Sequence, residues 1–236
     1  MSGGWFVTGT DTGVGKTLVS RLLLEALAHA GQSAVGMKPV ASGCRATDAG
    51  WRSDDARELL AASGVAADYA DVNPYALGSA CAPHIAAHEM GIEIQQEKII
   101  ESFRRLQQKS PWVVVEGVGG WLVPLGERLT LADVARAMRL PVIFVVGLRL
   151  GCLNHALLTV EAIRLTDVPL AGWVANQIDP AMTHVPENIA ALEQRIDAPL
   201  LAQFPFQPAV NPDVAASVLP IQMLMRSTIL MSGRTK

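Results

Sequence analysis

The segment "FVTGTDTGVGKT", residues 6–17, contains residue types that bind phosphate. Its glycines let successive backbone N–H groups converge on an anion. Lys16 would reach the β- and γ-phosphates of a nucleotide, and the Thr17 hydroxyl would bind Mg²⁺. The usual pattern has four residues between the first glycine and Gly-Lys-Thr, whereas five separate Gly9 from Gly15. We interpret the segment as a nucleotide site of variant geometry rather than a glycine-rich turn without a ligand.

Acidic residues at strand ends are candidate metal ligands. Glu116 ends the apolar run "WVVVE", and glycines follow it, so backbone can approach a ligand closely. Asp54 and Asp55 stand at the expected start of a helix, where acids commonly complement the helix dipole. On chemistry alone, either aspartate could bind Mg²⁺.

Lys38 ends another apolar run, in "GMKPVASG". At the end of a strand beside the phosphate loop, its ammonium could balance the negative charge that develops on a transferring phosphoryl group. We therefore take Lys38 and Lys16 as the candidate catalytic residues.

Alternating strands and helices must position these side chains. Continuous apolar runs predict strands that are covered on both faces, and their alternation with helices predicts parallel crossovers. The fold expected is a single doubly wound, mostly parallel α/β domain over residues 1–236, similar to P-loop NTPases. The expected strands are 5–8, 33–40, 112–117, 141–147, 170–176 and 199–205, with helices from Lys16 to Gly31 and over 54–62, 95–109 and 216–231. Segment 69–94 is less regular, and helix 216–231 would serve packing or dimer contact.

Composition excludes several classes of protein. Half of the 236 residues are hydrophobic and the net charge is −3, which gives no electrostatic reason to expect nucleic acid or a membrane surface. The uncharged run 140–148 is too short to cross a bilayer, and no secretory leader is visible. Cys44, Cys81 and Cys152 are scattered, so we expect reduced thiols in the cytoplasm. His84 and His88 lie four residues apart but lack a third metal ligand, so packing is favoured over a metal site.

The motifs together resemble the dethiobiotin synthetases. They are "VTGTDTGVGKT", "KPVASG", "VEGVGGWLVPL", "LPVIFVVGLRLGCLNHALLT" and "LAGWVAN", in that order between about residues 5 and 213. The widened phosphate loop is typical of this family. The resemblance implies ATP- and Mg²⁺-dependent carboxylation of 7,8-diaminononanoate by CO₂. The carbamate is phosphorylated to a carbamic–phosphoric anhydride, and the second amine closes the ureido ring.

The resemblance also implies the roles of particular residues. Mg²⁺ would be bound by Thr17, Asp55 and Glu116, and the diamine and its carbamate by Thr12, Lys38 and Ser42. The nucleotide would contact Gly13, Val14, Gly15, Lys16, Thr17, Leu18, Glu116, Gly117, Val118 and Gly119, with Asn176 and Gln177 at adenine. A second adenine-side loop contains Pro205, Phe206, Gln207 and Asp213, which match the family pattern only in part.

The family's substrate carboxylate site comes from a partner subunit. Here the corresponding turn is Gly151, Cys152, Leu153 and Asn154, where N–H groups at a helix start can receive a carboxylate. The resemblance thus implies a homodimer with substrate sites at the subunit interface.

Two other functions are open to such a sequence. A partitioning or maturation ATPase would act as a nucleotide switch through a protein partner, but such proteins typically have Lys-Gly-Gly where this chain has Thr10-Asp11-Thr12. A corrinoid amidase-type synthetase would need an added glutamine-hydrolysing domain, for which 236 residues leave no room.

Overall fold

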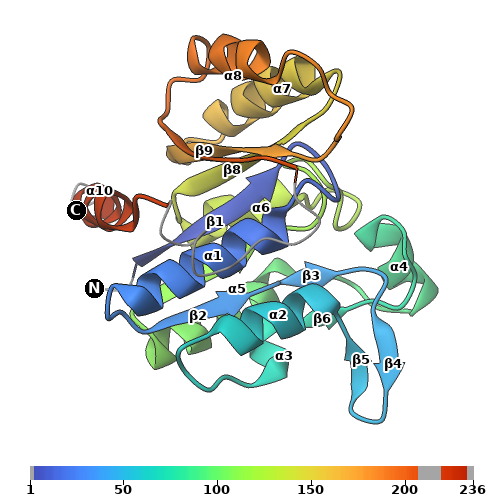
Figure 1. Ribbon diagram of the computed structural model, residues 1–236. Helices are drawn as coiled ribbons and strands as arrows, with labels where there is room; N and C mark the ends of the chain where they lie inside the picture. Colours follow the sequence, from blue (N-terminus) through green and yellow to red (C-terminus); the bar gives the residue numbers. More distant parts are fainter. Residues whose placement is uncertain (1–2, 207–218, 233–236) are drawn as a thin grey trace.

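A six-stranded parallel sheet forms the centre of the molecule, in the order β10-β9-β8-β1-β7-β2 (Figure 1). The computed structural model describes residues 3–206 and 219–232. Neighbouring strands all pair in parallel, which confirms the doubly wound α/β prediction. The strands are β1 (Gly3–Gly9), β2 (Ala34–Met37), β7 (Trp112–Glu116), β8 (Val142–Leu148), β9 (Leu170–Gln177) and β10 (Leu200–Phe204).

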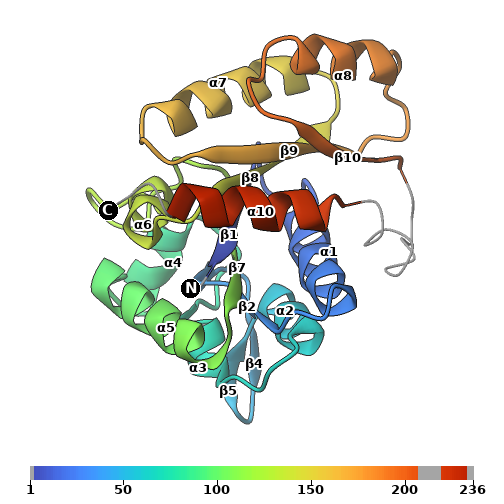
Figure 2. The same cartoon turned by 90° about the vertical axis from the view of Figure 1, so that its left-hand side faces the viewer.

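Helices cover both faces of this sheet, and each face has its own hydrophobic cluster (Figure 2). Successive side chains of a strand point to opposite faces, so Phe6 joins one cluster while Trp5 and Val7 join the other. The cluster with Trp5 contains side chains of α1 (Lys16–His29) and α10 (Ile221–Ser232). The cluster with Phe6 contains side chains of α5 (Gln96–Lys109), α6 (Leu131–Met138), α7 (Cys152–Arg164) and α8 (Val185–Glu193).

The C-terminal helix α10 confirms the packing role expected for it. It contacts β1, β9 and α1, and the Leu224 side chain is fully buried. Within the described residues, none of the helices combines the length and apolar character needed to cross a bilayer.

The second strand is shorter than predicted because the chain leaves the sheet at Lys38. Pro39 has no N–H to donate to a strand ladder, and the Lys38 N–H instead donates to the Val72 carbonyl. The Asn73 amide donates to the Lys38 carbonyl at 2.7 Å. Val40 then begins a separate two-stranded sheet of β3 (Val40–Ala41) and β6 (Tyr75–Ala76). This exit places the Lys38 side chain at the carboxyl end of the main sheet.

The region between β3 and α5 has more regular structure than the sequence predicted. A hairpin of β4 (Arg45–Thr47) and β5 (Gly50–Arg52) precedes α2 (Asp54–Ala62), and α3 (Tyr69–Val72) and α4 (Pro83–Glu89) follow. The hairpin and α4 extend beyond the main sheet on the side where the carboxyl ends of the sheet's strands lie (Figure 1). This part of the chain therefore forms a wall beside the phosphate loop.

Candidate functional site

A cavity of about 770 Å³ lies at the carboxyl ends of β1, β2 and β7. It joins the phosphate loop to residues that follow these strands and to the start of α2. The predicted site residues that line it are Thr12, Gly13, Gly15, Lys16, Thr17, Lys38, Ser42, Asp55, Glu116, Val118 and Gly119. Ligands bind at this edge of open α/β sheets, where the strand order reverses.

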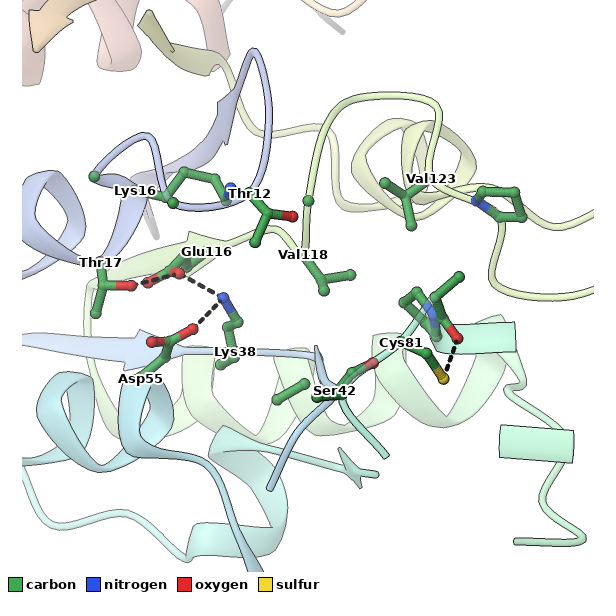
Figure 3. A pocket seen from close by; sticks show the side chains of 18 residues that line it. Thr12, Lys16, Thr17, Lys38, Ser42, Asp55, Cys81, Glu116, Val118 and Val123 are labelled. Atoms are coloured by element: carbon green, nitrogen blue, oxygen red, sulfur yellow. Dashed lines mark hydrogen bonds and ion pairs between the residues drawn. The ribbon is translucent and has the colours of Figure 1, made fainter. Parts of the chain in front are cut away.

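Lys38 lies between two carboxylates at the base of the cavity (Figure 3). Its Nζ is 2.8 Å from Asp55 Oδ2 and 2.5 Å from Glu116 Oε1, and it also donates to the Gly117 carbonyl at 3.2 Å. The Thr17 hydroxyl donates to Glu116 Oε1 at 2.9 Å. Lys38 and Glu116 are almost completely buried, so this ion pair lies away from bulk water.

Burial and charge pull the pKa values of these groups in opposite directions. Burial raises the pKa of Glu116, and the nearby Lys38 only partly opposes this increase. Burial lowers the pKa of Lys38, but Glu116 and Asp55 outweigh it, so the net shift is upward. For Asp55 burial raises the pKa, but Lys38, Thr17 and Lys16 together outweigh it, so the net shift is downward. Lys38 is thus held as a cation opposite ionised Asp55.

The donors around Lys38 suit Mg²⁺, which prefers oxygen ligands and keeps several waters. Thr17 supplies a hydroxyl, and Asp55 and Glu116 supply carboxylates. Glu116 Oε2 is buried without a hydrogen-bond partner in the described part of the chain. Those residues contain no group of three or more His, Cys, Asp or Glu that could bind a metal, so phosphate and water oxygens would complete the coordination. The Lys38 ammonium lies between the same two carboxylates that the metal would use.

The phosphate loop owes its shape to glycines and to a side chain from β9. Gly13 and Gly15 have φ angles of 74° and 96°, in the left-handed region that favours glycine. The Asn176 side-chain amide donates to the Val14 carbonyl at 2.9 Å, and a Cβ on Gly15 would lie 2.3 Å from that amide nitrogen. Gly15 therefore permits a close contact between the loop and β9.

Lys16 is turned onto its own loop. Its Nζ donates to the Asp11 carbonyl at 2.7 Å. Burial and the nearby Lys38 lower its pKa to about 8, although Glu116, Asp55 and Asp11 oppose the shift. The side chain lines the cavity, and one hydrogen bond to the Asp11 carbonyl leaves its other N–H donors available for a phosphate.

Several predicted residues lie elsewhere. Asp54 pairs with Arg45 at 2.7 Å and is not among the cavity-lining residues, so Asp55 is the aspartate of the cavity. The cavity lining likewise lacks Val14, Leu18, Gly117, Asn176, Gln177, Pro205, Phe206, Gly151, Cys152, Leu153 and Asn154. Gln207 and Asp213 lie outside the described residues.

The sequence did not predict the far wall of the cavity. This wall is formed by Ala41, Ala80, Cys81, Ala82, Pro83, Val123 and Pro124. Small apolar residues in short irregular segments have no periodicity that marks a site. The resulting wall is apolar, whereas the phosphate-loop side is charged.

Comparisons with known proteins identify related chains. The AAA domain family model matches residues 4–214. The ATP-dependent dethiobiotin synthetase BioD of Xanthomonas euvesicatoria is 49% identical over 219 residues, which cover 93% of this chain and 97% of the relative. The synthetase of the same name from Aromatoleum aromaticum is 52% identical over 215 residues, covering 91% and 96%.

Solved structures of two other groups share the fold. The MinD cell division protein of Aquifex aeolicus has a TM-score of 0.53 at 15% identity, covering 100% of this chain and 99% of that chain. A ParA family ATPase from Chlorobium tepidum has a TM-score of 0.55 at 12% identity, covering 100% and 94%. At these identities the likeness concerns the fold alone.

Proposed function

This chain belongs to the dethiobiotin synthetase family, and from that premise we propose how its residues carry out the reaction. The enzyme is an ATP-dependent ligase that forms C–N bonds in biotin biosynthesis. It converts 7,8-diaminononanoate, CO₂ and ATP into dethiobiotin, ADP and phosphate. The observation that carries the proposed mechanism is the convergence of Lys16, Thr17, Lys38, Asp55 and Glu116 on one cavity.

In the proposed sequence, one amine of the substrate attacks CO₂ and loses a proton, which gives a carbamate. A carbamate oxygen then attacks the γ-phosphorus of ATP, and ADP leaves. The second amine attacks the carbonyl carbon of the mixed anhydride, so that phosphate leaves with the bridging oxygen and the ring closes. Phosphoryl transfer brings two anions together, and ring closure joins a neutral amine to an anionic anhydride. Both steps therefore depend on positioning and positive charge.

The two lysines supply that charge in the proposal. Lys16 binds the β- and γ-phosphates with its remaining N–H donors, as expected for a phosphate-loop lysine. Lys38 holds the carbamate beside the γ-phosphate, and Thr12 and Ser42 contact the amine end of the substrate. The Ser42 hydroxyl has no hydrogen-bond partner in the described residues, which supports a ligand contact there.

Mg²⁺ would be held by Thr17, Asp55 and Glu116. When bound, it would neutralise charge on the phosphate oxygens. Lys38 would share both carboxylates with the metal, which would weaken their hold on its ammonium. The ammonium would then be free to turn toward the carbamate.

We also infer a homodimer in which the turn Gly151–Asn154 of one subunit receives the substrate carboxylate of the other. Exposed leucines at both ends of α7 and on its surface support such an interface. Leu150 is 95% exposed, Leu158 63% and Leu165 86%. We further propose one domain over residues 1–236 and a cytoplasmic setting, which the three free thiols support.

Phosphate release tests this function directly. The purified enzyme is mixed with ATP, Mg²⁺ and bicarbonate, with or without the diamine. Release that requires the diamine supports the ligase. Equal ATP turnover without it, or stimulation only by a protein partner, would instead indicate a nucleotide switch.

A further inference from the structure

The first half of the phosphate loop is attached to β8 beyond the end of β1. The Thr10 N–H donates to the Val145 carbonyl at 3.0 Å, and the Gly147 N–H donates to the Thr10 hydroxyl at 3.3 Å. Arg149 Nη2 then donates to Asp11 Oδ2 at 2.7 Å. Thr10 therefore lies along the last residues of β8, and Asp11 contacts the first residues after that strand.

Asp11 connects Arg149 to the nucleotide lysine. Its backbone carbonyl accepts the Lys16 ammonium, and its Oδ1 accepts the Thr12 N–H at 2.7 Å. The Lys16 ammonium has further N–H donors, so it can bind a phosphate while it keeps the Asp11 carbonyl. A bound nucleotide that fixes Lys16 therefore also fixes the peptide of Asp11, whose side chain contacts Thr12 and Arg149.

Arg149 is also part of the turn that follows β8. The Cys152 N–H donates to the Arg149 carbonyl at 3.0 Å, which closes the turn before α7. A continuous set of contacts thus runs from Lys16 through Asp11 and Arg149 to the Cys152 N–H of the turn 151–154.

Fold stability does not explain this ion pair. The side chains of Arg149 and Asp11 are 41% and 47% exposed, and exposed pairs contribute little to stability because water screens them. The pair instead connects the phosphate loop to the turn that follows β8.

We propose that Arg149 is a positioning residue that couples the nucleotide loop to the carboxylate-binding turn through Asp11. This rests on the proposed function, in which the turn Gly151–Asn154 receives the substrate carboxylate of the partner's site. A nucleotide that orders Asp11 also orders Arg149 and the turn. The turn then loses less conformational entropy when it binds a carboxylate. Nucleotide in one subunit therefore strengthens carboxylate binding at the interface, and the reverse effect has the same size.

Calorimetry with nonanoate separates this coupling from direct contacts. Nonanoate has the carboxylate and chain but no amines, so it cannot meet the γ-phosphate through a carbamate. Its dissociation constant is measured with and without AMP-PNP and Mg²⁺. We expect the nucleotide to tighten binding about fivefold or more in the unchanged enzyme, as is typical of coupled sites.

Three variants assign the effect to the pair. Asp11→Asn keeps the Arg149 charge near the turn, and we expect the nucleotide to leave the nonanoate dissociation constant of this variant nearly unchanged. Arg149→Lys keeps a cation, and we expect part of the nucleotide effect to persist. Arg164→Ala is the matched control, because Arg164 pairs with Glu161 at the same 2.7 Å farther along α7. It should keep the full nucleotide effect.

The outcomes distinguish this inference from the proposed function. An unchanged nucleotide effect in Asp11→Asn, or none in the unchanged enzyme, would overturn the coupling while leaving diamine-dependent phosphate release intact. If nonanoate does not bind, the same ratio is measured with 7,8-diaminononanoate, and an equal ratio in Asp11→Asn and unchanged enzyme again overturns the coupling. Loss of diamine-dependent phosphate release in the unchanged enzyme would overturn the function itself.

Discussion

Lys38 and Glu116 form a buried ion pair, with Nζ 2.5 Å from Oε1, at the point where three strand ends meet. The pair joins a group proposed to bind the carbamate to one proposed to bind Mg²⁺. We interpret it as the resting arrangement of the site, in which the ammonium satisfies carboxylates that a metal would later use. A metal that shared these carboxylates would weaken their hold on Lys38, whose ammonium could then contact the carbamate.

Replacing Lys38 by Met should slow turnover by about 100-fold or more while leaving ADP affinity nearly unchanged. The proposed role of Lys38 is charge stabilisation in the transition state, for which the loss of one group costs about 10²–10³ in rate. Single-turnover phosphate release and ADP titration measure the two effects. Loss of ADP binding with an otherwise normal enzyme would show that Lys38 is a nucleotide contact instead.

The same substitution leaves Glu116 buried without its cation, and removal of one partner of a buried pair costs about 3–5 kcal/mol. Slow turnover could therefore come from poor folding. In the double variant Lys38→Met with Glu116→Gln, the buried charge is also gone, so thermal stability should largely return while activity stays low. Recovery of activity together with stability would contradict the catalytic role.

Asp55→Asn should raise the Mg²⁺ concentration needed for half-maximal rate by about tenfold or more, since neighbouring groups alone change metal affinity by that much. Asp54→Asn is the control next to it, because Asp54 pairs with Arg45 outside the cavity. Its Mg²⁺ requirement should stay within about twofold of the unchanged enzyme. Equal shifts in the two variants would count against Asp55 as the ligand.

Gly15→Ala should weaken ADP binding about tenfold or more, because the new Cβ would lie 2.3 Å from the Asn176 amide nitrogen. Gly13→Ala provides the comparison. Gly13 also has a positive φ of 74°, but in the described part of the chain no heavy atom other than those of its chain neighbours lies within 4 Å of an added Cβ. Gly13→Ala should weaken ADP binding less than Gly15→Ala, since it introduces backbone strain without a clash. A larger loss in Gly13→Ala would indicate that the contact with β9 does not shape the loop.

ADP affinity should fall as the pH rises above about 8. The pKa of Lys16 in the free protein is lowered to about 8, and bound phosphates would raise it again. ADP binding is therefore strongest below pH 8, where Lys16 is already charged. Near pH 8.5 part of Lys16 is neutral, so ADP binding takes up protons from solution. Titration calorimetry in buffers of different ionisation enthalpy measures this uptake. In Lys16→Arg, whose charge persists throughout, the decline and the uptake should disappear; their persistence would assign them to another group.

The sequence predicted the parts of the site that depend on local pattern. Glycines before Lys16 and apolar runs ending at Lys38 and Glu116 were sufficient to bring these side chains to one edge of the sheet. The wall around Ala80–Pro83 was missed, because its position depends on β3 pairing with β6 across a long separation in the chain. Nor could spacing distinguish Asp55 from Asp54, since the Arg45 partner of Asp54 comes from a hairpin that has no strong pattern.

The most direct test of the mechanism follows oxygen from CO₂ into phosphate. The enzyme is given C¹⁸O₂, ATP, Mg²⁺ and the diamine, and the reaction is stopped before the label exchanges with water. If a carbamate oxygen attacks the γ-phosphorus, each turnover should yield phosphate with one ¹⁸O atom and dethiobiotin with another in its ureido carbonyl. Unlabelled phosphate beside labelled dethiobiotin would contradict the transfer of the phosphoryl group to a carbamate.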